Sequence, residues 1–331
     1  MSQSAADNLI TLPDARWNSW RWRPVLERWG SHRVFIDPNI LKTTAFIIEG
    51  GERMGTVFFV RVPLGKNPHD LFGEDYYAIT ANHVLGKSMS LRLPMANGQF
   101  QDKEIPLSDW TRDKEKDIAI LPIDFSLARY DLYPIPIRRA VTDREYLIAA
   151  QPNSEYEGFF HWGTGDEVFT VGLFDQDLGQ GSDRPVARFG HVALRPAEGE
   201  LLTIEIEGDT LVGADGFLVE MAGWPGQSGS PVFMRPWPDI DRMSAERPQS
   251  EVSFLLGMVQ GFYPGGTQDV EIDQTPFRVS GLNMGISVIL PARTFVDLLG
   301  SPELLERRER MLSQRVRTKR PRRAAKGKED Q

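Results

Sequence analysis

The stretch Gly223–Phe233 reads GWPGQSGSPVF and places the hydroxyl of Ser228 in a turn between two glycines. A serine in such a turn can bring its Oγ against a substrate carbonyl while nearby backbone N–H groups face the developing oxyanion. Glycine is needed on both sides because a Cβ would block this close approach. Flexible loops use the same letters, so a nucleophile is predicted only if a base and a carboxylate lie elsewhere.

Both of these groups precede Ser228 in the chain. Serine hydrolysis needs an imidazole to take the Oγ proton and a carboxylate to fix the tautomer of that imidazole. In Tyr76–Leu85, a β-rich run ends in small residues and then presents His83, and Asp117 opens an apolar, strand-like run to Leu121. The order His83, Asp117, Ser228 disfavours an α/β-hydrolase, in which the histidine follows the nucleophile.

The rival candidates have less suitable settings. Asp109 and Asp113 read as loop carboxylates, His69 as a surface-loop residue and His161 as a packing residue beside aromatics. No second His or Cys stands at metal-ligand spacing from His69, so no metal site is expected.

The chain resembles the trypsin-like serine peptidases of chymotrypsin fold, particularly their bacterial high-temperature-requirement branch. The resemblance runs from about Ala45 to Leu299 and is carried by short motifs in the family's order. These are Gly55–Val60, Thr80–Val84, Asp117–Leu121, Gly165–Gly172, Gly226–Pro231, Leu256–Val259 and Gly285–Pro291.

The resemblance implies an all-β fold, a chymotrypsin-like double six-stranded β-barrel with a C-terminal helix. It implies a triad of His83, Asp117 and Ser228, and an oxyanion hole made by the backbone N–H groups of Gly226 and Ser228. Protein or peptide substrates would be cleaved without a metal or organic cofactor.

The resemblance also places a substrate pocket at Ala222, Val259 and Gln260. Ala222 carries no charge that could pair with Lys or Arg, so a small or medium apolar residue is expected before the cleaved bond. Two residues depart from the family pattern, Gln227 in place of a common Asp or Asn and Ser230 in place of a common Gly. Neither removes a member of the triad.

Length and composition predict a soluble protein of the cytoplasm. The 331 residues include no cysteine, although secreted proteases of this fold usually carry disulfides. The first residues lack a signal-peptide pattern, and no apolar run is long enough to span a bilayer. Residues 301–331 hold eleven Lys/Arg against five Asp/Glu, whereas the other 300 hold 27 against 41. The body is therefore acidic and the tail basic.

Four parts are expected along the chain. A Trp-rich docking segment spans 1–42, the first barrel and a bridge span 43–163, and the second barrel with its closing helix spans 164–300. A basic tail, helical and then disordered from Arg315 to Lys328, spans 301–331 and leaves no room for a PDZ-like domain. Within the second barrel, Leu201–Glu207 alternates as a strand should, while Asp209–Gly216 and Pro264–Thr275 read as loops.

Three functional hypotheses follow. The first is a serine endopeptidase. The second is a latent or inactive protease-fold module that binds a protein partner, including an activating one, through its extensions. The third concerns the basic tail alone, which could contact nucleic acid or another acidic surface, or serve solubility. The tryptophans of 1–35 could stack on bases, although docking on the body is favoured.

Overall fold

The structure is a computed structural model. It describes residues 36–65, 73–142, 145–148, 158–172, 184–196, 202–206, 209–214, 216–223, 226–234, 253–264, 268–272, 275–279 and 283–319. The predictions for the Trp-rich segment at 1–35 and for the tail at 320–331 lie outside these residues.

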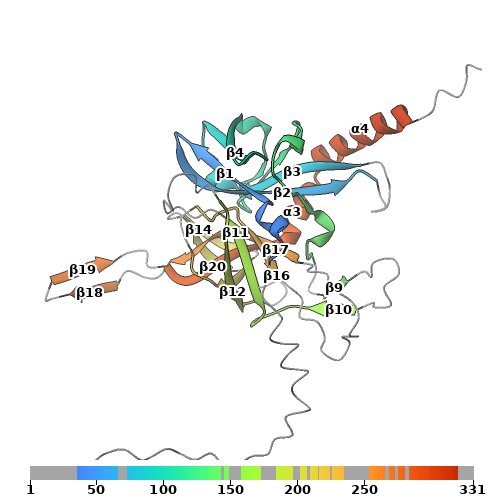
Figure 1. Cartoon of the computed structure of the whole chain (residues 1–331). Coiled ribbons are helices and arrows are strands. Elements are labelled where there is room, and N and C mark those ends of the chain that lie inside the picture. The colour runs from blue at the N-terminus through green and yellow to red at the C-terminus, as the bar shows by residue number, and fades with distance from the viewer. Residues whose placement is uncertain are drawn as a thin grey trace, which may run out of the picture. The chain divides into compact units, whose positions relative to one another are not determined.

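The first β unit is an eight-stranded sheet with the order β5-β4-β1-β2-β3-β7-β6, and β8 pairs with β2 (Figure 1). A short helix, α2 (Pro38–Leu41), precedes it. The strands are β1 (Thr44–Glu49), β2 (Glu52–Pro63), β3 (Glu74–Ala81), β4 (Met89–Pro94), β5 (Phe100–Ile105), β6 (Thr111–Asp113), β7 (Ile118–Pro122) and β8 (Ile135–Pro136). Single 3₁₀ turns lie at Asn82–Val84, Leu107–Asp109, Leu127–Arg129 and Ile137–Arg139.

The side-chain pattern of these strands explains the sheet. In β4, Met89, Leu91 and Leu93 are buried while the residues between them are half-buried, as in a strand with one wet face. In β2, by contrast, every residue from Gly55 to Val60 is buried, so both faces of this strand are covered.

The chain crosses from the first β unit to the second near Val141. The N–H of Val141 donates to the carbonyl of Leu255 at 2.9 Å, and the Val141 side chain belongs to the core of the second unit. The bridge also contains a two-stranded sheet, β9 (Glu145–Ile148) with β10 (Gly158–His161). The predicted bridge at Asp124–Gly163 therefore holds short strands as well as turns.

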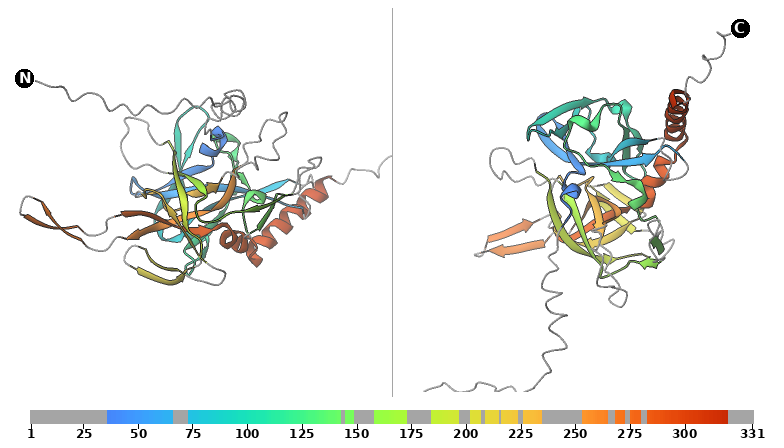
Figure 2. Two further views of the ribbon diagram at one scale, coloured as in Figure 1. Left: turned by 90° about the horizontal axis from the view of Figure 1, so that it is seen from below. Right: turned by 45° about the vertical axis from the view of Figure 1, so that its right-hand side comes forward.

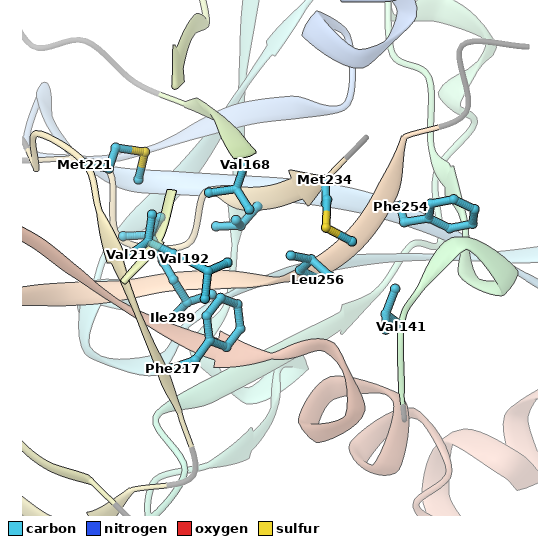
Figure 3. Packing of buried hydrophobic residues seen from close by; sticks show 12 residues of the cluster. Val141, Val168, Val192, Phe217, Val219, Met221, Met234, Phe254, Leu256 and Ile289 are labelled. Atoms are coloured by element: carbon cyan, nitrogen blue, oxygen red, sulfur yellow. The ribbon is translucent and has the colours of Figure 1, made fainter. Parts of the chain in front are cut away.

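The second β unit is a closed barrel with the order β11-β12-β15-β20-β17-β16. Its strands are β11 (Glu167–Gly172), β12 (Val186–Leu194), β15 (Phe217–Glu220), β16 (Pro231–Met234), β17 (Phe254–Pro264) and β20 (Asn283–Pro291). Figure 3 shows the core cluster inside it, built from inward side chains such as Val168, Val192, Val219 and Ile289. Every side chain of this cluster is at most 5% exposed.

Two further hairpins attach to the second unit, and they correct the loop predictions. The strands β13 (Leu202–Ile206) and β14 (Asp209–Ala214) pair with each other, as do β18 (Gln268–Ile272) and β19 (Thr275–Val279). Asp209–Gly216 and Pro264–Thr275 thus contain strands rather than being loops throughout. The strand β13 confirms the prediction for Leu201–Glu207, whereas β14 and β18 fall within the segments that were predicted to be loops.

Two helices close the chain and contact both β units. The first, α3 (Ala292–Leu299), packs against β7 of the first unit and against β17 and β20 of the second. Its Phe295 meets Phe58 edge to face, with ring centroids 5.7 Å apart. The second, α4 (Pro302–Lys319), lies beside the first sheet (Figure 2). The prediction of disorder from Arg315 is wrong as far as Lys319, because the helix continues to that residue.

A buried polar network anchors α4 to β3. Arg307 Nε donates to Asp75 Oδ2 at 3.0 Å, and the Tyr77 hydroxyl donates to the same oxygen at 2.6 Å. Arg307 also pairs with Asp124 at 2.7 Å. Burial opposes the charge of Arg307, yet these two carboxylates raise the pKa of its guanidinium. Burial, followed by the bond to Asp75, raises the pKa of Tyr77, whose hydroxyl therefore stays protonated.

This architecture confirms the predicted all-β, chymotrypsin-like double barrel with a C-terminal helix. It differs in detail, since the sheet of the first unit has eight strands rather than six. Within the described residues, no helix is both long enough and apolar enough to cross a membrane.

We predict that Asp75→Ala lowers the free energy of unfolding by about 3 kcal/mol, because it leaves Arg307 and the Tyr77 hydroxyl short of a buried acceptor. Urea denaturation of the full chain measures this change. The matched control is Arg310→Ala, which removes an exposed partner of Glu306 and should cost less than about 0.5 kcal/mol. Equal small effects from both variants would contradict the anchoring role of the network.

Candidate active site

The first half of the site is built by two adjacent strands of the first β unit. β3 and β7 pair antiparallel with Ala81 opposite Ile118. The residues just after β3 therefore lie beside the residue just before β7. These residues are Asn82 and His83 on one side and Asp117 on the other, and the N–H of Asn82 donates to the carbonyl of Asp117 at 3.1 Å.

The carboxylate of Asp117 holds His83 at two points. Asp117 Oδ1 accepts from the backbone N–H of His83 at 2.9 Å, and Oδ2 lies 2.8 Å from His83 Nδ1. A carboxylate only accepts hydrogen bonds, so Nδ1 carries the proton and Nε2 presents a lone pair. Asp117 is buried, with 5% of its surface exposed. This is the arrangement of a histidine prepared to act as a general base.

The backbone of Asp117 and the settings of its rivals support its selection. Asp117 has φ 52°, a left-handed conformation that Asp adopts more readily than most residues and that aims the carboxylate at His83. Asp113 instead accepts from the N–H groups of Glu115 and Lys116 and so holds the preceding turn. Asp109 is exposed. Among the described residues, neither Asp113 nor Asp109 forms a hydrogen bond or an ion pair with His83.

The residue before His83 is also fixed in place. Arg112 Nε, on β6, donates to Asn82 Oδ1 at 2.6 Å. This hydrogen bond joins the turn that carries His83 to β6, which pairs with β7. No sequence pattern indicated it.

The second half of the site is the turn at Gly226–Ser230, which the first β unit helps to hold. The N–H of Thr56 donates to the Ser228 carbonyl at 2.9 Å, and Thr56 Oγ1 donates to the Gly226 carbonyl at 3.0 Å. The second unit holds the turn as well, because the N–H of Gly229 donates to the carbonyl of Val259 on β17 at 2.8 Å. The turn therefore lies where the two units meet.

Glycine is required at two positions of this contact. Gly229 has φ 87°, and a Cβ there would lie 1.9 Å from the Thr56 carbonyl oxygen. A Cβ on Gly55 would lie 2.8 Å from Val84 Cγ1 and 3.1 Å from the Ser228 carbonyl. Gly55, on β2, thus lets the loop that contains His83 and the turn that contains Ser228 pack against the same strand.

The hydroxyl of Ser228 is turned toward a backbone carbonyl. Ser228 Oγ donates to the carbonyl of Gln260 at 3.2 Å, and among the described contacts none joins it to the His83 ring. The Gln260 side chain reaches the first unit, where its Nε2 donates to the Lys116 carbonyl at 3.4 Å. Gln260 therefore lies between Ser228 and the residue before Asp117.

The predicted oxyanion donors are in a suitable state. In the part of the chain that the structure describes, the N–H groups of Gly226 and Ser228 make no hydrogen bond, whereas those of Gly229 and Ser230 do. Unpaired amide donors beside a serine hydroxyl can receive an oxygen that becomes negatively charged.

The three predicted pocket residues have different settings. Ala222 is exposed, and its carbonyl accepts from Arg188 Nη1 at 3.3 Å. Gln260 is only 1% exposed, but its carbonyl faces Ser228. Val259 is fully buried in the core cluster of the second barrel.

The described residues contain no cluster of three or more metal-ligating side chains. A cavity of about 340 Å³ lies elsewhere, between α2, β1 and the turn from β4 to β5. Its Lys42 and Arg92 are paired with Asp131 and Asp102. None of the predicted site residues lines it.

No protein-family model matches the chain, and no curated protein matches it. Among solved structures, the chain is similar to the Rv3671c protease in an inactive form, with 16% identity over 79% of this chain and 89% of that chain and a TM-score of 0.37. For kallikrein-related peptidase 10 the identity is 13%, the coverage 80% and 97%, and the TM-score 0.40. For neuropsin, a serine protease of mouse brain, these values are 13%, 80% and 96%, and 0.41. Identities and TM-scores this low carry no argument about catalysis.

We predict that Gly229→Ala destabilises the protein far more than Gly98→Ala. Both glycines have a positive φ, so both variants bear the backbone strain of about 1–3 kcal/mol. Only Gly229 also meets backbone, at Thr56, while Gly98 faces open space. Thermal melting compares the two variants, and equal shifts of Tm would contradict the close contact between the two units.

Proposed function

We propose that this protein is a serine endopeptidase that cleaves protein or peptide substrates. In this proposal Ser228 is the nucleophile, His83 the general base and acid, and Asp117 the group that orients His83. The observation that carries the proposal is the two-point bond from the Asp117 carboxylate to the backbone and Nδ1 of His83. A histidine that only filled space in a core would not need both contacts.

The reaction would begin when Ser228 Oγ leaves the Gln260 carbonyl and turns to His83 Nε2. As Oγ attacks the substrate carbonyl carbon, its proton passes to Nε2, and Asp117 stabilises the imidazolium that forms. The N–H groups of Gly226 and Ser228 would hold the oxyanion. His83 would then protonate the leaving amine as the C–N bond breaks, and water would hydrolyse the acyl-enzyme by the same steps in reverse.

A second candidate function is a latent or inactive protease-fold module that binds a protein partner. The bond from Ser228 Oγ to the Gln260 carbonyl favours it, because a hydroxyl held there is not activated by His83. Catalytic hydrogen bonds are often long or poorly aligned in ligand-free enzymes and tighten only when substrate is bound. We therefore place the peptidase first and propose that substrate, or an activating protein, shifts Ser228 toward His83.

The test of the nucleophile is labelling of the full-length protein by a fluorophosphonate probe. Wild type should be labelled, while Ser228→Ala and His83→Ala should not be labelled, because the first lacks the nucleophile and the second its base. The matched control is Ser230→Ala, which removes a buried hydroxyl two residues away and should keep the label. A label retained in folded Ser228→Ala would overturn the proposal.

A separate prediction concerns Asp117. Asp117→Asn should slow labelling by about 10⁴-fold, since an amide can hold His83 in the wrong tautomer. Asp113→Asn, a change of the same chemistry in the preceding turn, should alter the rate by less than tenfold. The rates are followed by mass spectrometry of the intact protein, and similar effects from both variants would exclude the special role of Asp117.

A further inference from the structure

The side chain of Arg112 lies across the first sheet and contacts the turn that carries His83. The strand order places β7 between β6, which holds Arg112, and β3, which leads to Asn82 and His83. The Arg112 side chain therefore has to cross β7 before its Nε donates to Asn82 Oδ1 at 2.6 Å. The residue of β7 opposite Arg112 is Ala119, whose single methyl group leaves room for this crossing.

The turn that holds His83 depends on contacts with its surroundings, because the sheet ends before it. The ladder between β3 and β7 ends at Ala81, one residue before the turn Asn82–Val84. The turn closes by a backbone bond of its own, from the N–H of Leu85 to the carbonyl of Asn82 at 3.2 Å. Hydrogen bonds of 3₁₀ turns have poor geometry, so this bond alone does not fix the position of His83.

Each residue of the turn is held by a different part of the first sheet. Asp117, just before β7, accepts from the backbone and Nδ1 of His83. Val84 is buried and packs closely against β2. Asn82 is held through its side chain by Arg112 of β6. Asn82 also donates its N–H to the Asp117 carbonyl, so Arg112 supplies the contact of Asn82 that does not depend on Asp117.

The hairpin of β6 and β7 sets the spacing between Arg112 and Asp117. Asp113 is the last residue of β6, and its Oδ1 accepts from two N–H groups of the connection 114–117, at 3.1 and 3.0 Å. These bonds fix the shape of the connection. Arg112 and Asp117 stand on either side of it and hold neighbouring residues of one turn.

An arginine suits a permanent contact of this kind. Its guanidinium is charged throughout the pH range in which proteins fold, so Nε–H of Arg112 is always available as a donor. The bond to Asn82 joins a charged donor to an amide oxygen in a half-buried setting. Hydrogen bonds from charged donors are stronger than those between neutral groups. The contact is therefore strong enough to restrain the residue next to His83.

We propose that Arg112 is a positioning residue for the general base. Acting through Asn82, it keeps His83 where Nε2 can take the proton of Ser228. This inference rests on the proposed peptidase function and adds a residue to its machinery. Arg112 acts on the base and not on the substrate, so its loss should slow the chemical step and leave affinity nearly unchanged.

The test follows labelling of the full-length protein at a series of fluorophosphonate concentrations, which separates the maximal rate from the half-saturating concentration. Arg112→Gln and Asn82→Ala should each lower the maximal rate about 10–100-fold, the scale of loss when a catalytic group is misplaced by about 1 Å. The half-saturating concentration should stay within about threefold, because the lost interaction acts on the chemical step. Thermal melting checks that each variant is folded.

Three further variants separate positioning from a general loss of structure. The double variant of Arg112→Gln with Asn82→Ala should be no slower than the slower single variant, because both residues act through one bond. Asn82→Asp keeps the acceptor and should stay closer to the wild-type rate than Asn82→Ala. The matched control is Arg92→Gln, which removes an arginine of the same sheet that binds the exposed Asp102 and should keep the wild-type rate. Losses that multiply in the double variant, or an equal loss in the control, would overturn the inference.

A second measurement does not depend on labelling. A proton on His83 Nδ1 that is bonded to the Asp117 carboxylate gives a resonance far downfield in the proton NMR spectrum, and its absence in His83→Ala assigns it. The resonance should broaden through faster exchange with water in Arg112→Gln and stay sharp in Arg92→Gln. An unchanged resonance and an unchanged labelling rate in Arg112→Gln would overturn the inference and leave the peptidase proposal intact. A wild type without label would overturn the peptidase proposal, and the resonance would still decide whether Arg112 positions His83.

Discussion

The contact between Thr56 and the turn at Ser228 is the constraint on which the site depends. Thr56 donates from its backbone and its side chain to the carbonyls of Ser228 and Gly226, and its own carbonyl accepts from Thr80 Oγ1 at 2.7 Å. Thr80 lies in β3, the strand that leads to His83. One chain of hydrogen bonds therefore connects the strand of the base to the turn of the nucleophile. The network at Asp75 fixes the other end of the same strand to α4.

Gln260 contacts both halves of the candidate site. Its carbonyl accepts from Ser228 Oγ, while its side chain donates to the Lys116 carbonyl beside Asp117. In the described state His83 is oriented but does not hold the serine hydroxyl. A ligand that binds more tightly to the state with Ser228 on His83 will shift the balance toward catalysis, whether that ligand is substrate or a partner. In the function that we propose, the peptidase and the latent module would be two populations of one arrangement.

The sequence predicted the fold class, and it singled out His83, Asp117 and Ser228 because each lies at a strand end or turn with a strong local pattern. It missed β14 and β18, whose segments carry residues typical of turns, such as Asp209, Gly213, Pro264 and Gly265, although each strand pairs with its neighbour in a hairpin. The helical extension to Lys319 follows from the anchor of Arg307 on Asp75, about 230 residues away in the chain.

The most direct test of this account is a crystal structure of the protein after reaction with a phosphonate. The account predicts a covalent bond from Ser228 Oγ to phosphorus, with Oγ no longer bonded to the Gln260 carbonyl. The phosphonyl oxygen should accept from the N–H groups of Gly226 and Ser228, and His83 should keep both contacts with Asp117. An adduct on another residue, or a phosphonyl oxygen directed away from these two amides, would contradict the assignment of the site.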